Sequence, residues 1–184
     1  MPEALWFTED DAACRLLADD PFALLVGFAL DQQVTVQQAF LGPLRLKERL
    51  GTLEPSAVAA ADLEPLFRQK PAIHRFPGSM AERVRELAAT VAAEYGGDAS
   101  RLWTDAADGA DLKRRLAGLP GFGDMKVRSM LAVLAKRFGV RLEGLEDVLP
   151  THPTLGDVDS NESRQRYQEA KRAYKARMKA QQSG

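Results

Sequence analysis

The sequence predicts an all-α protein that forms a single domain over residues 1–184. Apolar residues recur at helical spacing, and no segment shows the sustained apolar–polar alternation that is typical of a half-buried strand. Residues that begin and end helices also punctuate the chain. With 184 residues, of which 45% are hydrophobic, the chain is long enough to bury a sizeable core.

The composition excludes several classes of protein. Cys14 is the only cysteine, so one chain can form neither an internal disulfide nor an all-cysteine zinc or iron–sulfur site. His74 and His152 are too few for a histidine-rich metal centre. The apolar run 21–30 is about half of what a membrane span needs, and no cationic leader precedes it. We therefore expect a soluble cytoplasmic protein.

Two helix starts are predicted near the N-terminus. Thr8 and Asp11 have the spacing of a capping box, which predicts the start of a first helix. Asp20 followed by Pro21 predicts an N-cap and a first-turn proline. The helix that follows, over 21–30, is apolar almost all round, so we expect it to be the central buried helix.

The polar run 31–34 ends that central helix. Thr35 with Gln38 then predicts the cap of the next one. Gly42-Pro43 predicts a bend or an end within this next helix, because proline lacks the N–H that continues a helical ladder.

The middle of the chain alternates a short helix, a loop and a long helix. A short helix is predicted near 63–69, and the proline-punctuated run 70–78 predicts a loop. Ser79 with Glu82 has capping-box spacing and predicts the start of a strong helix that ends at a glycine pair.

Three further helices are predicted in the C-terminal half. A helix over 110–118 begins after Asp108-Gly109, a second runs over 124–138, and a basic C-terminal helix covers 161–180. The net charge of −1 hides four charged blocks along the chain. These are 1–20 (net −5), 111–138 (net +5), 141–160 (net −4) and 162–184 (net +5). A charge run alone most often marks a solvated helix face, so a block gains meaning only where it contains a motif.

One such motif, LPGFG at 119–123, lies inside the first basic block. Gly121 and Gly123 can adopt positive φ and allow another backbone to approach closely, while Phe122 fills the space between two helices. The next helix begins at once, so its unpaired N–H groups favour an anion such as a phosphodiester.

Cationic side chains surround this turn. They are Lys113, Arg114, Arg115, Lys126 and Arg128. Asp124 opposes them, because it occupies the position at the helix start that a phosphate would take. The alternative is a structural αα-hairpin whose glycines serve only close packing. Because turn, helix start and cations coincide, we expect DNA contacts from Leu119, Gly121, Phe122, Gly123, Lys126 and Arg128.

LPGFG followed by a lysine resembles the helix-hairpin-helix motif of the HhH-GPD superfamily of base-excision DNA glycosylases. FALDQQVTVQQAF at 28–40 is similar to the segment from which that family pushes a glutamine into the duplex, and its QQV run resembles the alkyladenine branch. HRFPGSMAERV at 74–84 resembles a small subgroup of HhH-GPD-type repair proteins. The resemblance covers about 20–160 and implies a two-lobed helical fold with a DNA groove between the lobes.

The resemblance implies a hydrolase that removes a damaged or mispaired base, with an alkylated purine favoured by the QQV run. Its partner would be double-stranded DNA, bound by a monomer associated with the nucleoid. We expect no cofactor and no iron–sulfur cluster, with a monovalent cation at the hairpin as the one alternative. The rival classes are a non-catalytic helix-hairpin-helix DNA-binding protein and an interaction protein of stacked helices that binds no nucleic acid.

Breaking an N-glycosidic bond creates an oxocarbenium-like sugar, which needs an ionised carboxylate beside it. The resemblance assigns this role to an Asp that follows the hairpin's second helix, and Asp157 matches that position best. The loop before Asp157 is longer than the family's usual connection, so Asp147 is the rival and Asp159 a weaker one. Read without the family, Asp157 and Asp159 are acids that stabilise a helix dipole.

Bifunctional relatives form a Schiff base through a lysine two residues after the last hairpin glycine. Here that position holds Met125, and Lys126 follows one residue later, about 100° further around the helix. We therefore expect a monofunctional enzyme without AP-lyase activity.

Gln33, with Gln32 beside it, is the expected wedge that fills the gap left by the flipped base. The alternative for Gln33 is an ordinary polar residue between two helices. His74-Arg75 belongs either to a contact with the DNA backbone or to a plain surface loop, and the basic helix over 161–180 either docks on the core or lies along DNA.

Overall fold

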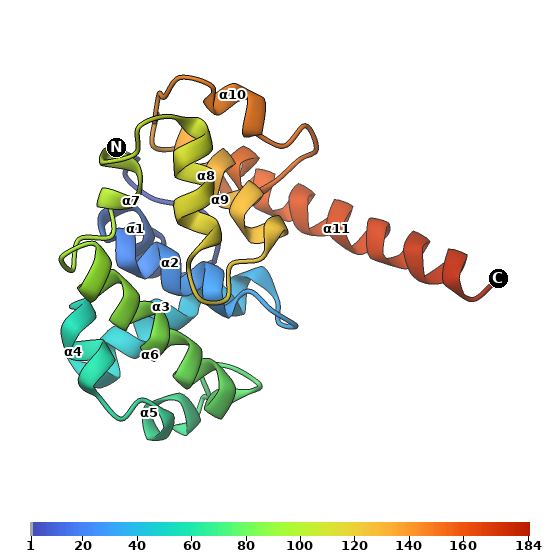
Figure 1. Cartoon of the computed structure of the whole chain (residues 1–184). Coiled ribbons are helices and arrows are strands. Elements are labelled where there is room, and N and C mark those ends of the chain that lie inside the picture. Colours follow the sequence, from blue (N-terminus) through green and yellow to red (C-terminus); the bar gives the residue numbers. More distant parts are fainter. Residues whose placement is uncertain (1) are drawn as a thin grey trace.

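The computed structural model describes residues 2–184, and every regular element in that range is helical (Figure 1). The all-α prediction is therefore confirmed. The elements, in chain order, are α1 (Asp11–Asp19), α2 (Pro21–Leu30), α3 (Val36–Leu50), α4 (Pro55–Ala60), α5 (Glu64–Arg68), α6 (Pro77–Glu94), α7 (Arg101–Thr104), α8 (Gly109–Ala117), α9 (Asp124–Lys136), α10 (Leu145–Val148), the 3-10 turn η1 (Leu155–Asp157) and α11 (Asn161–Gln182).

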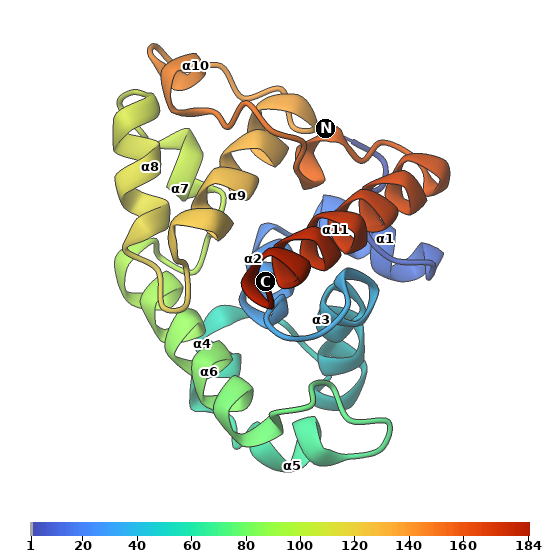
Figure 2. The same cartoon turned by 90° about the vertical axis from the view of Figure 1, so that its right-hand side faces the viewer.

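The helices pack in two groups that share one core. α1 to α6 pack on one another, whereas α7, α8, α10 and η1 gather around α9 in the C-terminal half (Figures 1 and 2). A continuous set of buried apolar side chains runs through both groups. α2 is the central helix, as predicted, and all its residues from Phe22 to Leu30 are buried.

Two of the four predicted caps are present, at Asp20 and Thr35, and Asp108 caps the helix predicted to begin after it. The Asp20 side chain accepts the N–H groups of Phe22 and Ala23, Thr35 accepts Gln38 N–H at 3.1 Å, and Asp108 accepts Asp111 N–H at 2.7 Å. Each carboxylate or hydroxyl satisfies a donor that the first turn of a helix would otherwise leave unpaired. Local sequence therefore fixes where α2, α3 and α8 begin.

Two predicted caps are wrong. α1 is capped by Asp10, which accepts Ala13 N–H at 2.9 Å, and Thr8 is instead buried before the helix. α6 begins at Pro77, two residues before Ser79, because a first-turn proline already has a helical φ. The Phe76 N–H that precedes it donates to His74 Nδ1 at 3.0 Å.

The helix does not end at Gly42-Pro43, because α3 continues through both residues, so that alternative of the prediction is wrong. A Cβ on Gly42 would lie 2.4 Å from Leu30 Cδ1, so the glycine lets α2 pack directly against α3. This tertiary packing holds the helix together across a proline that would end an isolated one. The sequence also gave no signal for the short helices α4, α7 and α10, and α9 ends at Lys136 rather than at residue 138.

Candidate nucleic-acid interface

The predicted turn between α8 and α9 forms as a tight corner. Gly121 has φ +81°, which a residue with a side chain adopts only at a cost, and Phe122 N–H donates to Leu119 O at 3.1 Å. Gly123 has φ −77° and an extended conformation, so the prediction of positive φ holds for Gly121 and is wrong for Gly123. Leu119 and Phe122 are both buried, as expected of residues that fill the space between two helices.

The corner is open on one side and covered on the other. Nothing lies within 4 Å of a Cβ built on Gly123, and no side chain caps the first turn of α9. A Cβ on Gly121 would lie 2.5 Å from Arg83 Nη1 and 2.7 Å from Arg83 Cδ. Arg83 of α6 therefore lies over the corner, a cation from the other group of helices that the sequence did not single out.

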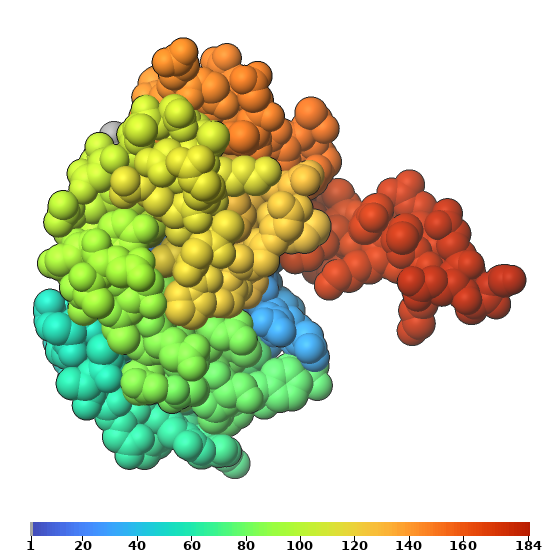
Figure 3. Space-filling model, viewed as in Figure 1, coloured from blue at the N-terminus to red at the C-terminus, as the bar shows by residue number. Residues whose placement is uncertain are grey.

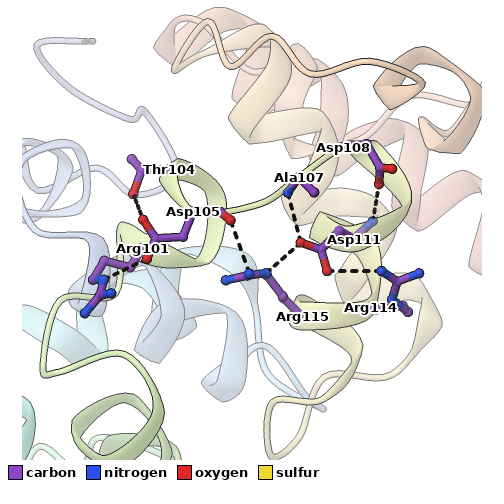
Figure 4. Close-up of polar contacts among 8 residues, drawn as sticks. All are labelled: Arg101, Thr104, Asp105, Ala107, Asp108, Asp111, Arg114 and Arg115. Carbon is purple, nitrogen blue, oxygen red and sulfur yellow. Dashed lines mark hydrogen bonds and ion pairs between the residues drawn. The ribbon is translucent and has the colours of Figure 1, made fainter.

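The basic block around the corner is partly neutralised (Figure 4). Arg115 Nε lies 3.0 Å and Arg114 Nη2 3.1 Å from the Asp111 carboxylate. The backbone N–H of Ala107, followed by these two arginines, holds the pKa of Asp111 below its usual value. Two of the cations expected near the corner are therefore committed to the start of α8.

Two further predicted DNA contacts also have partners within the chain. Arg128 Nε lies 2.9 Å from Asp124 on the exposed first turns of α9. Lys126 Nζ turns inward and donates to the carbonyl oxygen of Ala29 at 3.2 Å. Burial, reinforced by the charge of Arg83, lowers the pKa of Lys126, although the charge of Asp31 opposes the shift.

Lys126 joins the corner to the end of α2. The rings of Phe28 and Phe122 reinforce this junction, with centroids 6.4 Å apart. The turn that follows α2 carries the two glutamines predicted as a wedge, and both are exposed. Gln33 has φ +57°, which makes it the one described non-glycine residue with positive φ. The structure therefore brings the hairpin and the Gln33 turn to neighbouring positions.

His74 holds this turn in place from the 70–76 segment. Its ring is fully buried, and Nε2 lies 3.1 Å from both Leu30 O and Gln32 O. Because Nδ1 accepts Phe76 N–H, the ring is neutral with its proton on Nε2. Burial lowers the pKa of His74, which also favours the neutral ring.

A cluster of charged and polar side chains gathers at the C-terminal end of α2. We call it the Asp31 cluster, and its members are Asp31, Lys126, Tyr167, Lys171 and Lys175. Burial raises the pKa of Asp31, while the charges of Lys171, Lys126 and Lys175 oppose that shift. The signal in the sequence was an acid placed directly after a fully buried helix, but its neighbours come from α9 and α11.

Asp157 is bound on both of its oxygens. Oδ1 accepts from Lys136 Nζ at 2.6 Å, and Oδ2 accepts Thr154 N–H at 2.9 Å. Burial alone would raise the pKa of Asp157, but the hydrogen bonds from Lys136 and Thr154, with the charges of Lys136 and Arg137, lower it. This carboxyl group is therefore held ionised beside α9.

The two rival acids lie elsewhere. Asp147 is exposed on α10, which packs against α8 and α9 at the top of Figure 1. Asp159 is exposed before α11, where hydrogen bonding to Ser163 lowers its pKa. Tyr167 of α11 is close enough to both Asp31 and Asp157 that their charges add to burial and raise its pKa to about 12. Asp31 and Asp157 thus both act on the pKa of Tyr167, whereas Asp147 does not.

Two aromatic pairs and one surface hollow add no exposed group to the candidate site. Phe28 and Phe40 are core residues whose rings meet edge to face, with centroids 5.2 Å apart. The ring centroids of Trp103 and Phe138 lie 6.0 Å apart. A surface hollow of about 340 Å³ lies between the start of α2 and the 97–99 segment, and its lining includes no residue of the corner or the Gln33 turn.

Within residues 2–184, no three His, Cys, Asp or Glu side chains gather closely enough to hold a metal ion. The monovalent cation expected at the hairpin stays a prediction. Among the described helices, none combines the length and apolar character that crossing a membrane requires.

No family model, no curated protein and no solved structure matches the chain. The function is therefore argued from the residues and their geometry.

Proposed function

We propose that this chain is a monofunctional DNA glycosylase that hydrolyses the N-glycosidic bond of a damaged or mispaired base, with an alkylated purine as the favoured substrate. One observation carries the proposal: the Gly121–Gly123 corner and the Gln33 turn lie side by side. Lys126 Nζ on Ala29 O at 3.2 Å and the Phe28–Phe122 contact join them, although they are far apart in the sequence.

The corner supplies the grip on the sugar-phosphate backbone. Free N–H groups at the uncapped start of α9 favour an anion, and the open space at Gly123 lets a phosphodiester approach them. Arg83 adds a positive charge at the same corner, and the exposed Arg128 can exchange Asp124 for a phosphate. None of these contacts reads a base, which suits an enzyme that must search any sequence.

The Gln33 turn supplies the wedge. A left-handed backbone in a residue with a side chain costs about 1 kcal/mol, and such strain persists only where the surroundings enforce it. His74 and its bonds to Leu30 O and Gln32 O are that enforcement. The exposed amide of Gln33 can then fill the space of an extruded nucleotide, while Gln32 supports it.

The two carboxyl groups whose charges raise the pKa of Tyr167 suit two different tasks. Asp157, held ionised by Lys136, stabilises the positive charge that develops on the sugar and orients the attacking water. Asp31, whose pKa is raised by burial, is the proposed donor of a proton to the departing base. Water adds to C1′ as the carbon–nitrogen bond breaks, so the products are the free base and an abasic site. Two acids with shifts in opposite directions are typical of such a division of labour.

The absence of lyase activity in this proposal rests on α9. Met125 occupies the position from which a Schiff-base lysine would act, and its side chain is 76% exposed. Lys126 Nζ is instead bonded to Ala29 O. Borohydride added during turnover should trap no covalent adduct between enzyme and DNA, and a trapped adduct would contradict the monofunctional assignment.

The test is a panel of duplexes, each with one alkylated, deaminated, oxidised or mispaired base. We expect alkali-dependent strand breaks with at least one substrate and intact strands without alkali. The control is Asp147→Asn, which alters an exposed acid on α10 and should leave the breaks unchanged. A folded protein that binds duplex DNA but yields no abasic site from any substrate would contradict the proposal.

That outcome would support the second candidate, a non-catalytic helix-hairpin-helix DNA-binding protein. One observation favours it: both oxygens of Asp157 are already used within the chain, by Lys136 and by Thr154 N–H. If Asp157 serves only that structural purpose, the corner would still bind a phosphodiester.

A further inference from the structure

α11 is fixed to the body of the protein only at its N-terminal end. Ser160 caps it, and the buried Arg164 donates through Nη1 to Thr8 O at 2.6 Å and to Asn161 Oδ1 at 2.7 Å. The face of Tyr167 and Lys171 that looks toward the body is half-buried. These contacts fix the direction in which the rest of the helix extends.

Beyond Lys171 the helix stands clear of the protein. Figures 1 and 3 show it projecting away from both groups of helices, and every residue from 172 onward is exposed. Residues 162–184 carry seven bases and two acids, and no acid follows Glu169. Among residues 2–184, no ion pair involves a side chain of α11. The projecting part is therefore a row of unneutralised cations.

The cations on one face of α11 lie toward the candidate site. Lys171 and Lys175, one helical turn apart, both act on the carboxyl group of Asp31. Figure 2 shows α11 crossing in front of α2, and Figure 1 shows its C-terminal half projecting away from the body of the protein. By helical spacing, Arg166 and Arg177 lie on the opposite face.

We propose that α11 is an arm that binds the phosphate backbone of the same duplex whose nucleotide the corner and the Gln33 turn engage, so this inference rests on the proposed function. The charge of the arm selects the partner. Tyr174 and Met178 are the only large apolar side chains exposed on the projecting part, which is too little apolar area for a stable protein interface. A polyanion instead neutralises the whole row, because each phosphate contact releases a counterion.

The test compares two double variants that remove the same charge from opposite faces. Lys171→Gln/Lys175→Gln changes the face toward Asp31, and Arg166→Gln/Arg177→Gln changes the other, while glutamine keeps a similar helix propensity. Affinity for an undamaged duplex is measured against salt concentration, and circular dichroism checks that each variant is folded. We expect the salt slope of the lysine variant to fall by about two and that of the arginine variant to stay at the wild-type value.

The outcomes separate this inference from the function on which it rests. Wild-type protein that shows no salt-dependent binding to any duplex contradicts the proposed function itself. Wild-type protein that binds, with an unchanged slope in the lysine variant, leaves the proposed function standing and overturns the arm. A salt slope that falls equally in both double variants overturns the claim that only the face of Lys171 and Lys175 contacts DNA. A lysine-variant slope that falls only with single-stranded RNA gives the arm a different partner and also overturns the inference.

Discussion

The charges of Asp31 and Asp157 both raise the pKa of Tyr167, yet the protein surrounds these two carboxyl groups in opposite ways. Asp157 has a cation on one oxygen and a backbone N–H on the other, at 2.6 and 2.9 Å. Asp31 has three lysines near it but no hydrogen bond to its side chain among residues 2–184, and burial dominates its environment.

The difference shows that nearby positive charge does not by itself lower the pKa of a carboxyl group. Direct hydrogen bonds to the charged form lower the pKa of Asp157, whereas desolvation outweighs more distant charges and raises that of Asp31. A pair of this kind suits one ionised and one protonated role at the same pH. The predictions below test that contrast.

The largest expected effect is on base excision. Asp157→Asn should lower the single-turnover excision rate about 1,000-fold, because the amide cannot stabilise positive charge on the sugar. Asp31→Asn should lower it about 100-fold, the usual contribution of one general acid. Rapid-quench assays at saturating enzyme measure both rates. If Asp157→Asn retains the wild-type excision rate, Asp157 is not the carboxylate that stabilises the sugar.

A second effect concerns the turn that carries Asp31. His74→Ala should lower the free energy of unfolding by about 2–3 kcal/mol, because it removes the side-chain donor to Gln32 O, takes one of two donors from Leu30 O and creates a cavity. His152→Ala is the matched control, since His152 is exposed. Urea titrations monitored by circular dichroism measure both variants, and equal stability of the two would mean that His74 does not hold the turn.

The same histidine gives a dependence on pH. Its pKa is lowered in the folded protein from 6.5, so the unfolded chain takes up the proton first as pH falls. Stability contributed by His74 is therefore complete above about 6.5 and declines below it. In His74→Ala this decline should disappear from urea midpoints measured between pH 7.5 and 5.

The two carboxyl groups should affect stability with opposite signs. Asp31 has a raised pKa, so its ionisation opposes folding at neutral pH, and this penalty fades as pH falls toward 3.8. Asp31→Asn should therefore be more stable than wild type at pH 7, with an advantage that shrinks in acid. Thermal unfolding at pH 7 and pH 4.5 measures the difference, and an Asp31→Asn variant that is less stable at pH 7 would contradict the desolvated environment.

Asp157 should behave in the reverse way. Its lowered pKa stabilises the fold above 3.8 and less so as pH falls below that value. Because its side chain is 43% exposed, solvent screening limits the cost of Asp157→Asn to about 1 kcal/mol. Lys136→Met should cost a similar amount, and the double variant should cost less than the sum, since the two residues form one ion pair.

The smallest effect separates strain from function at Gln33. Gln33→Gly should stabilise the protein by about 1 kcal/mol, because glycine adopts φ +57° without penalty, yet lower excision about tenfold through loss of the wedge. Gln32→Gly is the control, and it should destabilise slightly because Gln32 has no positive φ to relieve. A gain in stability with no loss of excision would leave Gln33 as a strained residue without a role in flipping.

The sequence predicted what short-range signals determine. Caps at Asp20, Thr35 and Asp108, the apolar helix over 21–30 and the corner at 119–123 are local patterns, and the structure contains each. Short helices such as α4 and α7 form through tertiary packing, which no local pattern reports.

The residues that surround the candidate site could not be predicted from the sequence either, because tertiary packing brings them together. Arg83 covers Gly121, and His74 bonds to Leu30 O, only because two distant segments are brought together. The shift at Asp31 depends on burial by the surrounding fold and on lysines from α9 and α11. Asp157 was selected by resemblance to a family motif, and its catalytic role stays a prediction.

The central claim is that this surface binds DNA and stabilises positive charge on a sugar, and one measurement tests it without knowledge of the damaged base. A duplex that carries a protonated pyrrolidine in place of one nucleotide mimics the oxocarbenium ion, and a tetrahydrofuran at the same place is its uncharged match. We predict that the protein binds the pyrrolidine duplex at least about 100-fold more tightly, and that Asp157→Asn removes this preference. Equal affinity of the folded wild-type protein for both duplexes would contradict the account.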